Sequence, residues 1–84
     1  MRSDLPRFFF DFDEGDHRIP DPDGTEFQDA ESACEEAAAA LANIAADATP
    51  SPHSPTELAV LVRDEAGQPI YRATLTIRGE RIGA

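Results

Sequence analysis

The chain has few residues with sulfur or imidazole side chains. Cys34 is the only cysteine, and the only histidines are His17 and His53. A single cysteine excludes an intramolecular disulfide framework, and without a second thiol or a third histidine no zinc site can be completed. We therefore expect neither a metal nor another cofactor, and we interpret Cys34 as a small apolar residue on the inner face of a helix.

Long apolar runs are missing as well. The longest run near the N-terminus, residues 8–10, is ended by Asp11 and is too short for the apolar region of a secretory signal. No stretch approaches the roughly 18 apolar residues that a membrane span needs. Together with the lone cysteine, this pattern predicts a cytoplasmic protein without a membrane partner.

Lysine is absent, so all seven basic residues are arginines, and 17 acidic residues bring the net charge to −10. The acidic excess lies in the first two thirds of the chain, because arginines and acids balance from Glu57 onward. A field of this sign disfavours duplex DNA and anionic membranes as partners.

Signatures of catalysis are also lacking. The serines do not lie in a strand-turn-helix nucleophile motif, and the glycines do not form a phosphate-binding loop. The acidic run at residues 11–26 fails the spacing of an EF-hand calcium loop, because neither Gly15 nor Gly24 falls at the sixth position counted from an acidic start. We interpret this run as solvated acidic turns and expect no enzymatic activity.

Length and composition predict one domain, because a chain of 84 residues with 40% hydrophobic content encloses a single apolar core. We place this domain at residues 6–78, between flexible tails at 1–5 and 79–84. Inside it, Asp29 is suited to cap an alanine-rich helix at residues 30–48, which the prolines of residues 49–55 end. Small and apolar residues recur at helical spacing along the expected inner stripe, which is Ala30, Ala33, Cys34, Ala37, Leu41, Ile44, Ala45 and Ala48.

Alternating residues predict strands at 7–12, 57–63 and 70–78, and a short strand at 17–19 would form a hairpin with the first. Asp23-Gly24 predicts a turn, and residues 64–69 form the turn of a second hairpin. The order is β(β)αββ. We therefore expect an α+β fold, with an antiparallel sheet of three to four strands and one helix packed on one of its faces.

Successive residues of a strand point to opposite faces of the sheet, so the predicted strands divide into two sets. The set expected beneath the helix is Phe8, Phe10, Phe12, Leu58, Val60, Val62, Tyr71, Ala73, Leu75 and Ile77. The other face is left open, and its aromatic, aliphatic and arginine side chains form the candidate interaction face: Phe9, Arg7, Leu61, Arg63, Ile70, Arg72 and Arg78.

Three stretches carry a resemblance to known proteins: PRFFFDF at residues 6–12, DGTEF at 23–27 before the acidic start of the helix, and VLVRDEAGQPIYRATL at 60–75. Together they resemble a widespread family of small bacterial proteins with a domain of unknown function, over roughly residues 6–77. Asp11 stands where that family usually has histidine, and Gln68 where it often has arginine. The resemblance implies a small α+β domain in the bacterial cytosol and carries over no catalytic residue.

Three interpretations of the open face compete. An aromatic and two aliphatic residues rimmed by arginine suit a protein interface, and a small, marginally stable domain gains from forming a homodimer. Phenylalanine beside arginine on an open sheet also suits single-stranded nucleic acid, although the net charge disfavours it. The third interpretation is an ordinary half-exposed sheet with Arg–Asp pairs. The sequence favours the first interpretation, a non-catalytic interaction or regulatory module that binds a second copy of itself or another protein.

Overall fold

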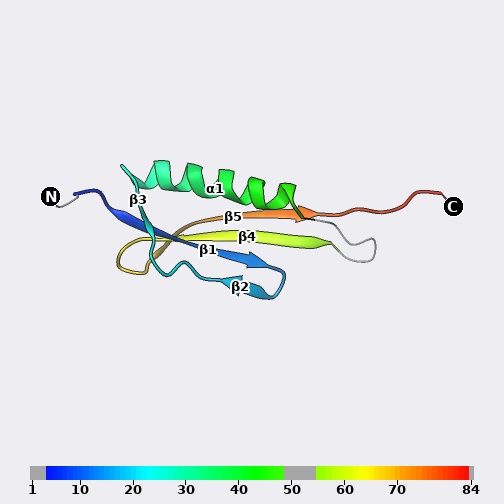
Figure 1. The fold of residues 1–84 in the computed structure, drawn as a ribbon, viewed down its shortest axis with the longest axis horizontal. Coiled ribbons are helices and arrows are strands. Elements are labelled where there is room, and N and C mark those ends of the chain that lie inside the picture. Colours follow the sequence, from blue (N-terminus) through cyan, green and yellow to red (C-terminus); the bar gives the residue numbers. More distant parts are fainter. Residues whose placement is uncertain (1–3, 49–54, 84) are drawn as a thin grey trace.

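The structure is a computed structural model that describes residues 4–48 and 55–83. One helix and a small antiparallel sheet form an α+β fold, as the sequence predicts (Figure 1). The predicted loop at 49–55 lies outside the described residues except for Pro55, and so does His53. The elements are β1 (Arg7–Glu14), β2 (His17–Ile19), β3 (Thr25–Glu26), α1 (Ala30–Ala46), β4 (Thr56–Arg63) and β5 (Pro69–Ile77).

The sheet has the order β2-β1-β4-β5, with every neighbouring pair antiparallel, and β3 pairs with the beginning of β1. The short second strand at 17–19 is confirmed. Several predicted bounds are corrected: β1 ends at Glu14 rather than at residue 12, the helix ends at Ala46 rather than at residue 48, and β5 ends at Ile77 rather than at residue 78. The strands β4 and β5 each begin one residue earlier than predicted. The strand β3 was not predicted, because two polar residues show no alternation and become a strand only by pairing with Arg7 and Phe8.

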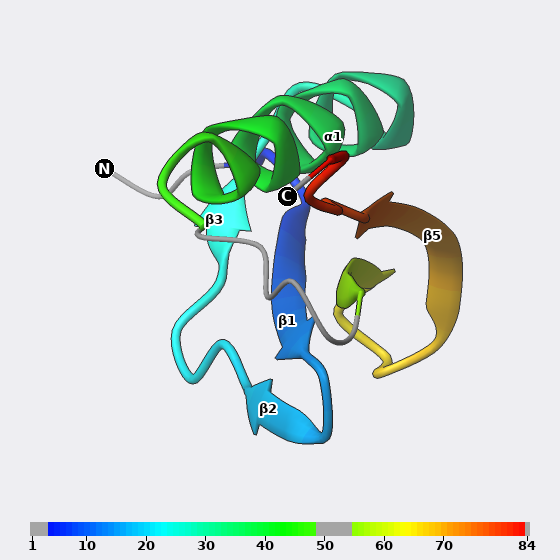
Figure 2. The ribbon, with the colours of Figure 1, turned by 90° about the vertical axis from the view of Figure 1, so that its right-hand side faces the viewer.

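The N-terminus of α1 is formed as the sequence predicts. The Asp29 carboxylate accepts a hydrogen bond of 2.8 Å from the Ser32 backbone N–H, and this bond lowers the pKa of Asp29. Ala33 and Ala37 are fully buried on the inner face of the helix, where their small side chains let the helix lie close to the sheet. Figure 2 shows α1 running across one face of the strands, and among the described residues only that face is covered by a second layer.

The core lies between α1 and the sheet and consists of Phe8, Ala33, Ala37, Leu41, Leu58, Val60 and Val62. Of the three phenylalanines expected there, only Phe8 is buried, while Phe10 and Phe12 are half-buried against its rim. Phe10 stacks on Phe27, with ring centroids 5.5 Å apart. Phe27 was not among the predicted core residues; an aromatic residue in an otherwise polar segment was its only sequence signal.

Candidate interaction surface

The sheet face opposite α1 is built by three adjacent strands in a known register. Asp11 of β1 lies beside Leu61 of β4, which lies beside Arg72 of β5. In the next row toward the other end of the strands, Asp13, Ala59 and Thr74 lie side by side in the same way. We call this surface, from Phe9 and Arg63 at one end to Glu57 and Thr76 at the other, the open face.

Two of the predicted residues, Phe9 and Arg63, form a compact group with Asp11 at the first end of the open face. The Arg63 guanidinium lies 5.1 Å from the centre of the Phe9 ring, a cation–π arrangement. The same guanidinium donates two hydrogen bonds to the Asp11 carboxylate, of 2.7 Å from Nε and 3.1 Å from Nη2. Such a bidentate contact fixes the plane of the guanidinium, and the fixed guanidinium in turn packs on one face of the Phe9 ring.

Phe9 is covered on a further side by the turn that follows β2. A side-chain carbon added at Gly24 would lie 2.8 Å from Cε2 of Phe9, so only hydrogen separates this backbone from the ring. Arg7 holds the turn there, because its guanidinium donates to the carbonyl oxygens of Asp23 and Gly24 at 2.9 and 3.2 Å. Phe9 and Arg7 are consequently half-buried parts of an internal contact.

The remaining predicted residues are less tied to the chain. Leu61 is half-buried, whereas Ile70 keeps 40% of its surface exposed and Arg72 is exposed. Arg78 lies one residue beyond the end of β5, so the structure does not bring it into the sheet. The free part of the open face is therefore centred on Leu61, Ile70 and Arg72.

Two carboxylates of the acidic run accept hydrogen bonds from backbone N–H groups of the chain, which corrects the expectation that the run forms solvated turns. Asp11 is only 5% exposed. Its Oδ1 accepts a hydrogen bond of 3.0 Å from the Asp21 backbone N–H. Asp21 in turn accepts from the backbone N–H groups of Phe10, Asp23 and Gly24 at 3.1, 3.2 and 2.9 Å.

These hydrogen bonds decide the charge state of both carboxyl groups. Burial raises the pKa of Asp21, but the three N–H donors outweigh this and leave the pKa below its ordinary value. The pKa of Asp11 is also lowered, mainly because Arg63 donates to its carboxylate, against the opposing effect of burial. Both groups stay ionised and act as acceptors that attach the turn at residues 21–24 to β1.

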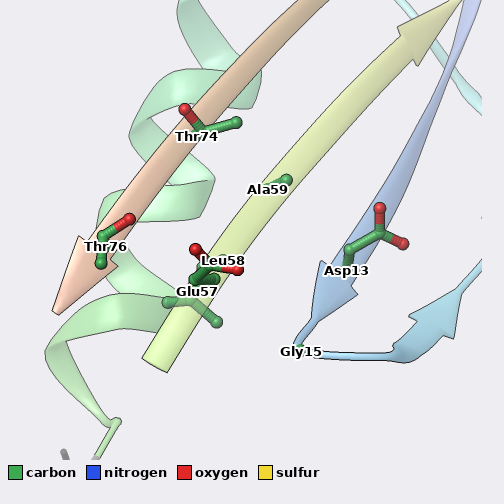
Figure 3. A pocket seen from close by; sticks show the side chains of 7 residues that line it. All are labelled: Asp13, Gly15, Glu57, Leu58, Ala59, Thr74 and Thr76. Atoms are coloured by element: carbon green, nitrogen blue, oxygen red, sulfur yellow. The ribbon is translucent and has the colours of Figure 1, made fainter. Parts of the chain in front are cut away.

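A hollow of about 310 Å³ lies at the other end of the open face (Figure 3). Its lining combines carboxylates, hydroxyls and small residues: Asp13, Gly15, Glu57, Leu58, Ala59, Thr74 and Thr76. Asp13 is bound by Arg18 at 2.7 Å, and this contact lowers the pKa of Asp13. Glu57 is exposed, and among the described residues its carboxylate has no hydrogen bond or ion pair.

Sequence reasoning did not predict this hollow, because its residues come from three strands and meet only in the final register. Chemically, the exposed Glu57 carboxylate and the threonine hydroxyls can accept hydrogen bonds from a cationic side chain. In residues 4–48 and 55–83 no group of three or more Asp, Glu, His or Cys residues is arranged to hold a metal ion.

The buried Asp11–Arg63 ion pair predicts that the stability of the fold depends on pH. Because the pKa of Asp11 is lower in the folded chain than its ordinary value of 3.8, its stabilising effect is complete above that value and is lost as the pH falls through the folded pKa. We expect Asp11→Asn to lower the free energy of unfolding clearly at pH 7, and the difference from wild type to shrink below about pH 4. Urea unfolding at pH 7, 5 and 3 measures it.

Asp13→Asn is the matched control. It also removes a carboxylate from an arginine, but Arg18 keeps 54% of its side chain exposed, and exposed pairs contribute little. Equal losses of stability for Asp11→Asn and Asp13→Asn at pH 7 would contradict the structural role of the Asp11–Arg63 pair.

Among the described residues, no helix is both long enough and apolar enough to cross a membrane. A comparison with protein-family models matches residues 7–76 to a family described as a domain of unknown function, DUF6894. Searches of curated proteins and of solved structures gave no match to this chain.

Proposed function

We propose that this chain, which belongs to the DUF6894 family of domains of unknown function, is a non-catalytic protein-interaction module that contacts its partner through the open face. The observation that carries the proposal is the one-sided layering of the fold. Helix α1 covers one face of the sheet, and the opposite face presents Leu61, Ile70 and Arg72 without a covering layer from the described residues.

The open face has properties that suit a protein interface. Arg63 is already fixed by Asp11 and by the Phe9 ring, so little side-chain freedom is lost when a partner covers it. The apolar side chain of Leu61 lies between this group and the polar hollow, and Ile70 lies at the Arg63 end of β5. Apolar residues beside polar ones resemble the apolar centre and polar rim of interfaces. A second copy of the chain is our first candidate partner, because a small domain with a thin core gains stability by association.

Ile70→Glu tests the proposal directly. It places a charge at the centre of the free part of the open face, and the 40% exposure of Ile70 allows the variant to fold. We expect wild type to associate at micromolar concentrations in light scattering, and Ile70→Glu to weaken this association roughly tenfold or more.

Ile82→Glu is the matched control, because it makes the same substitution at a residue that is 89% exposed and lies after the last strand. It should associate as wild type does. If Ile70→Glu and Ile82→Glu behave alike, the open face is not the contact surface.

Single-stranded nucleic acid ranks second among the proposed partners. Phe9 is the only aromatic ring among the predicted open-face residues, and Arg63 and Gly24 already lie against it, which leaves little of the ring for a base to stack on. The proposal predicts salt-sensitive binding of a labelled strand that Arg72→Ala weakens. Absence of binding at about 50 mM salt would reject it.

A bacterial cytoplasmic location is part of the same proposal. It is supported by the lone, half-buried Cys34, because a chain without a second cysteine has no disulfide that an oxidising compartment would be needed to form. Fractionation of cells that express a tagged chain tests it.

A further inference from the structure

Strand β5 has a neighbour on one side only. Within the described residues it pairs with β4, and its other edge carries no strand. It is also the longest strand, with nine residues, and Figure 2 shows it at the rim of the sheet. The backbone N–H and C=O groups along this rim are a template on which a further strand can pair.

The features that usually protect such an edge are confined to the beginning of β5, at residues 69–72, and are missing from residues 73–77. Pro69 is the first residue of β5, and the one irregularity of register leaves Ile70 of β5 without a partner residue in β4. Residues 73–77 contain no proline, no charged residue and no such irregularity. Ile70 and Leu75 are 40% and 37% exposed, one on each face of the strand. At the opposite rim, β2 has only three residues, which is itself a form of protection.

We propose that β5 pairs antiparallel with β5 of a second copy, so that the two sheets join into one. The symmetry axis of such a pair runs perpendicular to the sheet, and residues directly opposite each other lie on the same face. Both helices then lie on one side and both open faces on the other. This inference goes beyond the proposed function, because it uses the edge of the sheet rather than its face.

Arg72 excludes two registers of this pair. Centring the pair on Arg72 would place the two Arg72 side chains directly opposite each other. Centring it on Leu75 would place Arg72 opposite Arg78. Like charges directly opposite each other destabilise antiparallel pairs. An axis at residue 71 or earlier would centre the pair on the irregular beginning of β5, and an axis at residue 76 or later would pair three residues or fewer. The axis therefore lies at Ala73 or at Thr74.

Glu57 selects between the two remaining registers. With the axis at Thr74, Arg72 lies opposite Thr76 of the other copy, and Glu57 is the β4 neighbour of Thr76. Among the described residues, neither the Arg72 guanidinium nor the Glu57 carboxylate has a side-chain hydrogen bond or a salt bridge, although Arg72 interacts electrostatically with Asp13. This register gives the Glu57 carboxylate a partner of opposite charge across the interface and gives Arg72 a second one. With the axis at Ala73, Arg72 lies opposite Thr74, beside Ala59 instead.

The register centred on Thr74 also covers exposed apolar surface. On the side of the helix it places Leu75 opposite Ala73 of the second copy, and Tyr71 opposite Ile77. The hollow beside Glu57 meets its symmetry mate at the axis, since Thr74 and Thr76 line it. The dimer therefore presents the two hollows as one polar surface on the joined open face.

Two measurements on the full chain test the edge pairing. Light scattering should show a dimer at micromolar concentrations. Amide hydrogen exchange, compared between dilute and concentrated samples, should show slower exchange in β5 on association and unchanged exchange in β2. A chain that stays monomeric at millimolar concentration, or an association that leaves β5 amides unaffected, overturns the inference.

A charge exchange tests the register. Arg72→Glu and Glu57→Arg should each weaken the dimer about tenfold or more. In either variant, residues 72 and 57 of opposite copies carry like charges, and this contact occurs twice in the symmetric dimer. An equimolar mixture of the two variants should recover most of the wild-type affinity. Within one chain the row of Glu57 lies about 13 Å along the strands from Arg72, so recovery reports contact between chains. Failure of the mixture to recover overturns the inference.

The results also separate this inference from the proposed function. If β5 amides become protected while Ile70→Glu leaves association unchanged, the edge pairing stands and the open face fails as the contact surface between copies. If Ile70→Glu abolishes association and β5 amides do not change, the proposed function stands and the edge pairing fails.

Discussion

Replacing Gly24 with alanine is expected to lower the free energy of unfolding by about 3 kcal/mol or more. Gly24 has a φ of +70°, and an added side-chain carbon would lie 2.8 Å from Cε2 of Phe9 and 2.9 Å from the backbone oxygen of Phe8. The backbone oxygen cannot move aside as a flexible side chain can. The turn must therefore separate from β1, with loss of the hydrogen bonds that Asp21 and Arg7 make there.

Gly67→Ala is the control for this prediction. Gly67 also has a positive φ, of +81°, but no atom lies within 4 Å of an added carbon. The substitution should lower the free energy of unfolding only through the unfavourable positive φ of an alanine, by about 1 to 2 kcal/mol. Urea unfolding of both variants gives the comparison, and equal losses would show that the approach of Gly24 to Phe9 does not constrain the fold.

Phe8→Ala is expected to cost about 3 to 5 kcal/mol, the usual range for removing a buried phenylalanine. Phe8 is 5% exposed and is the only phenylalanine in the buried core. Domains of this size are stable by only about 5 to 15 kcal/mol, so the variant should lie close to global unfolding. Thermal and urea unfolding measure the loss.

Phe10→Ala provides the comparison within the same strand. Phe10 is half-buried and packs against Phe27 at the rim of the core, so the loss should be smaller than for Phe8→Ala. The reverse ranking would mean that the cluster of Phe10 and Phe27, rather than the contact of Phe8 with α1, contributes most of the apolar stabilisation.

The open face illustrates what alternation can and cannot predict. The sequence correctly assigned Arg7, Phe9 and Asp11 to one side of β1, because side chains alternate along any strand. It could not predict that Asp11 binds Arg63, since that contact needs the register between β1 and β4. Residues distant in the sequence meet only when that register forms, and so a residue expected in a solvated acidic run is buried.

The same limit applies to the edge strand. Alternation predicts that residues 70–78 form a strand, but nothing local distinguishes a central strand from one at the rim. Strand order is a property of the whole sheet, and it places β5 at the rim next to β4. The interpretation of β5 as a pairing surface therefore depends on topology and not on composition.

The sequence by itself determined the elements whose causes are local: the Asp29 cap, the alanine-rich helix, the turn at Gly24 and the alternation of the long strands. Hydrogen bonds and side-chain spacings within a few residues decide these features. Only the tertiary structure decided that β3 forms, that Phe27 packs on Phe10, and that Asp11 is buried with Arg63. Each of these depends on free energy gained between distant segments, which exists only after the chain has folded.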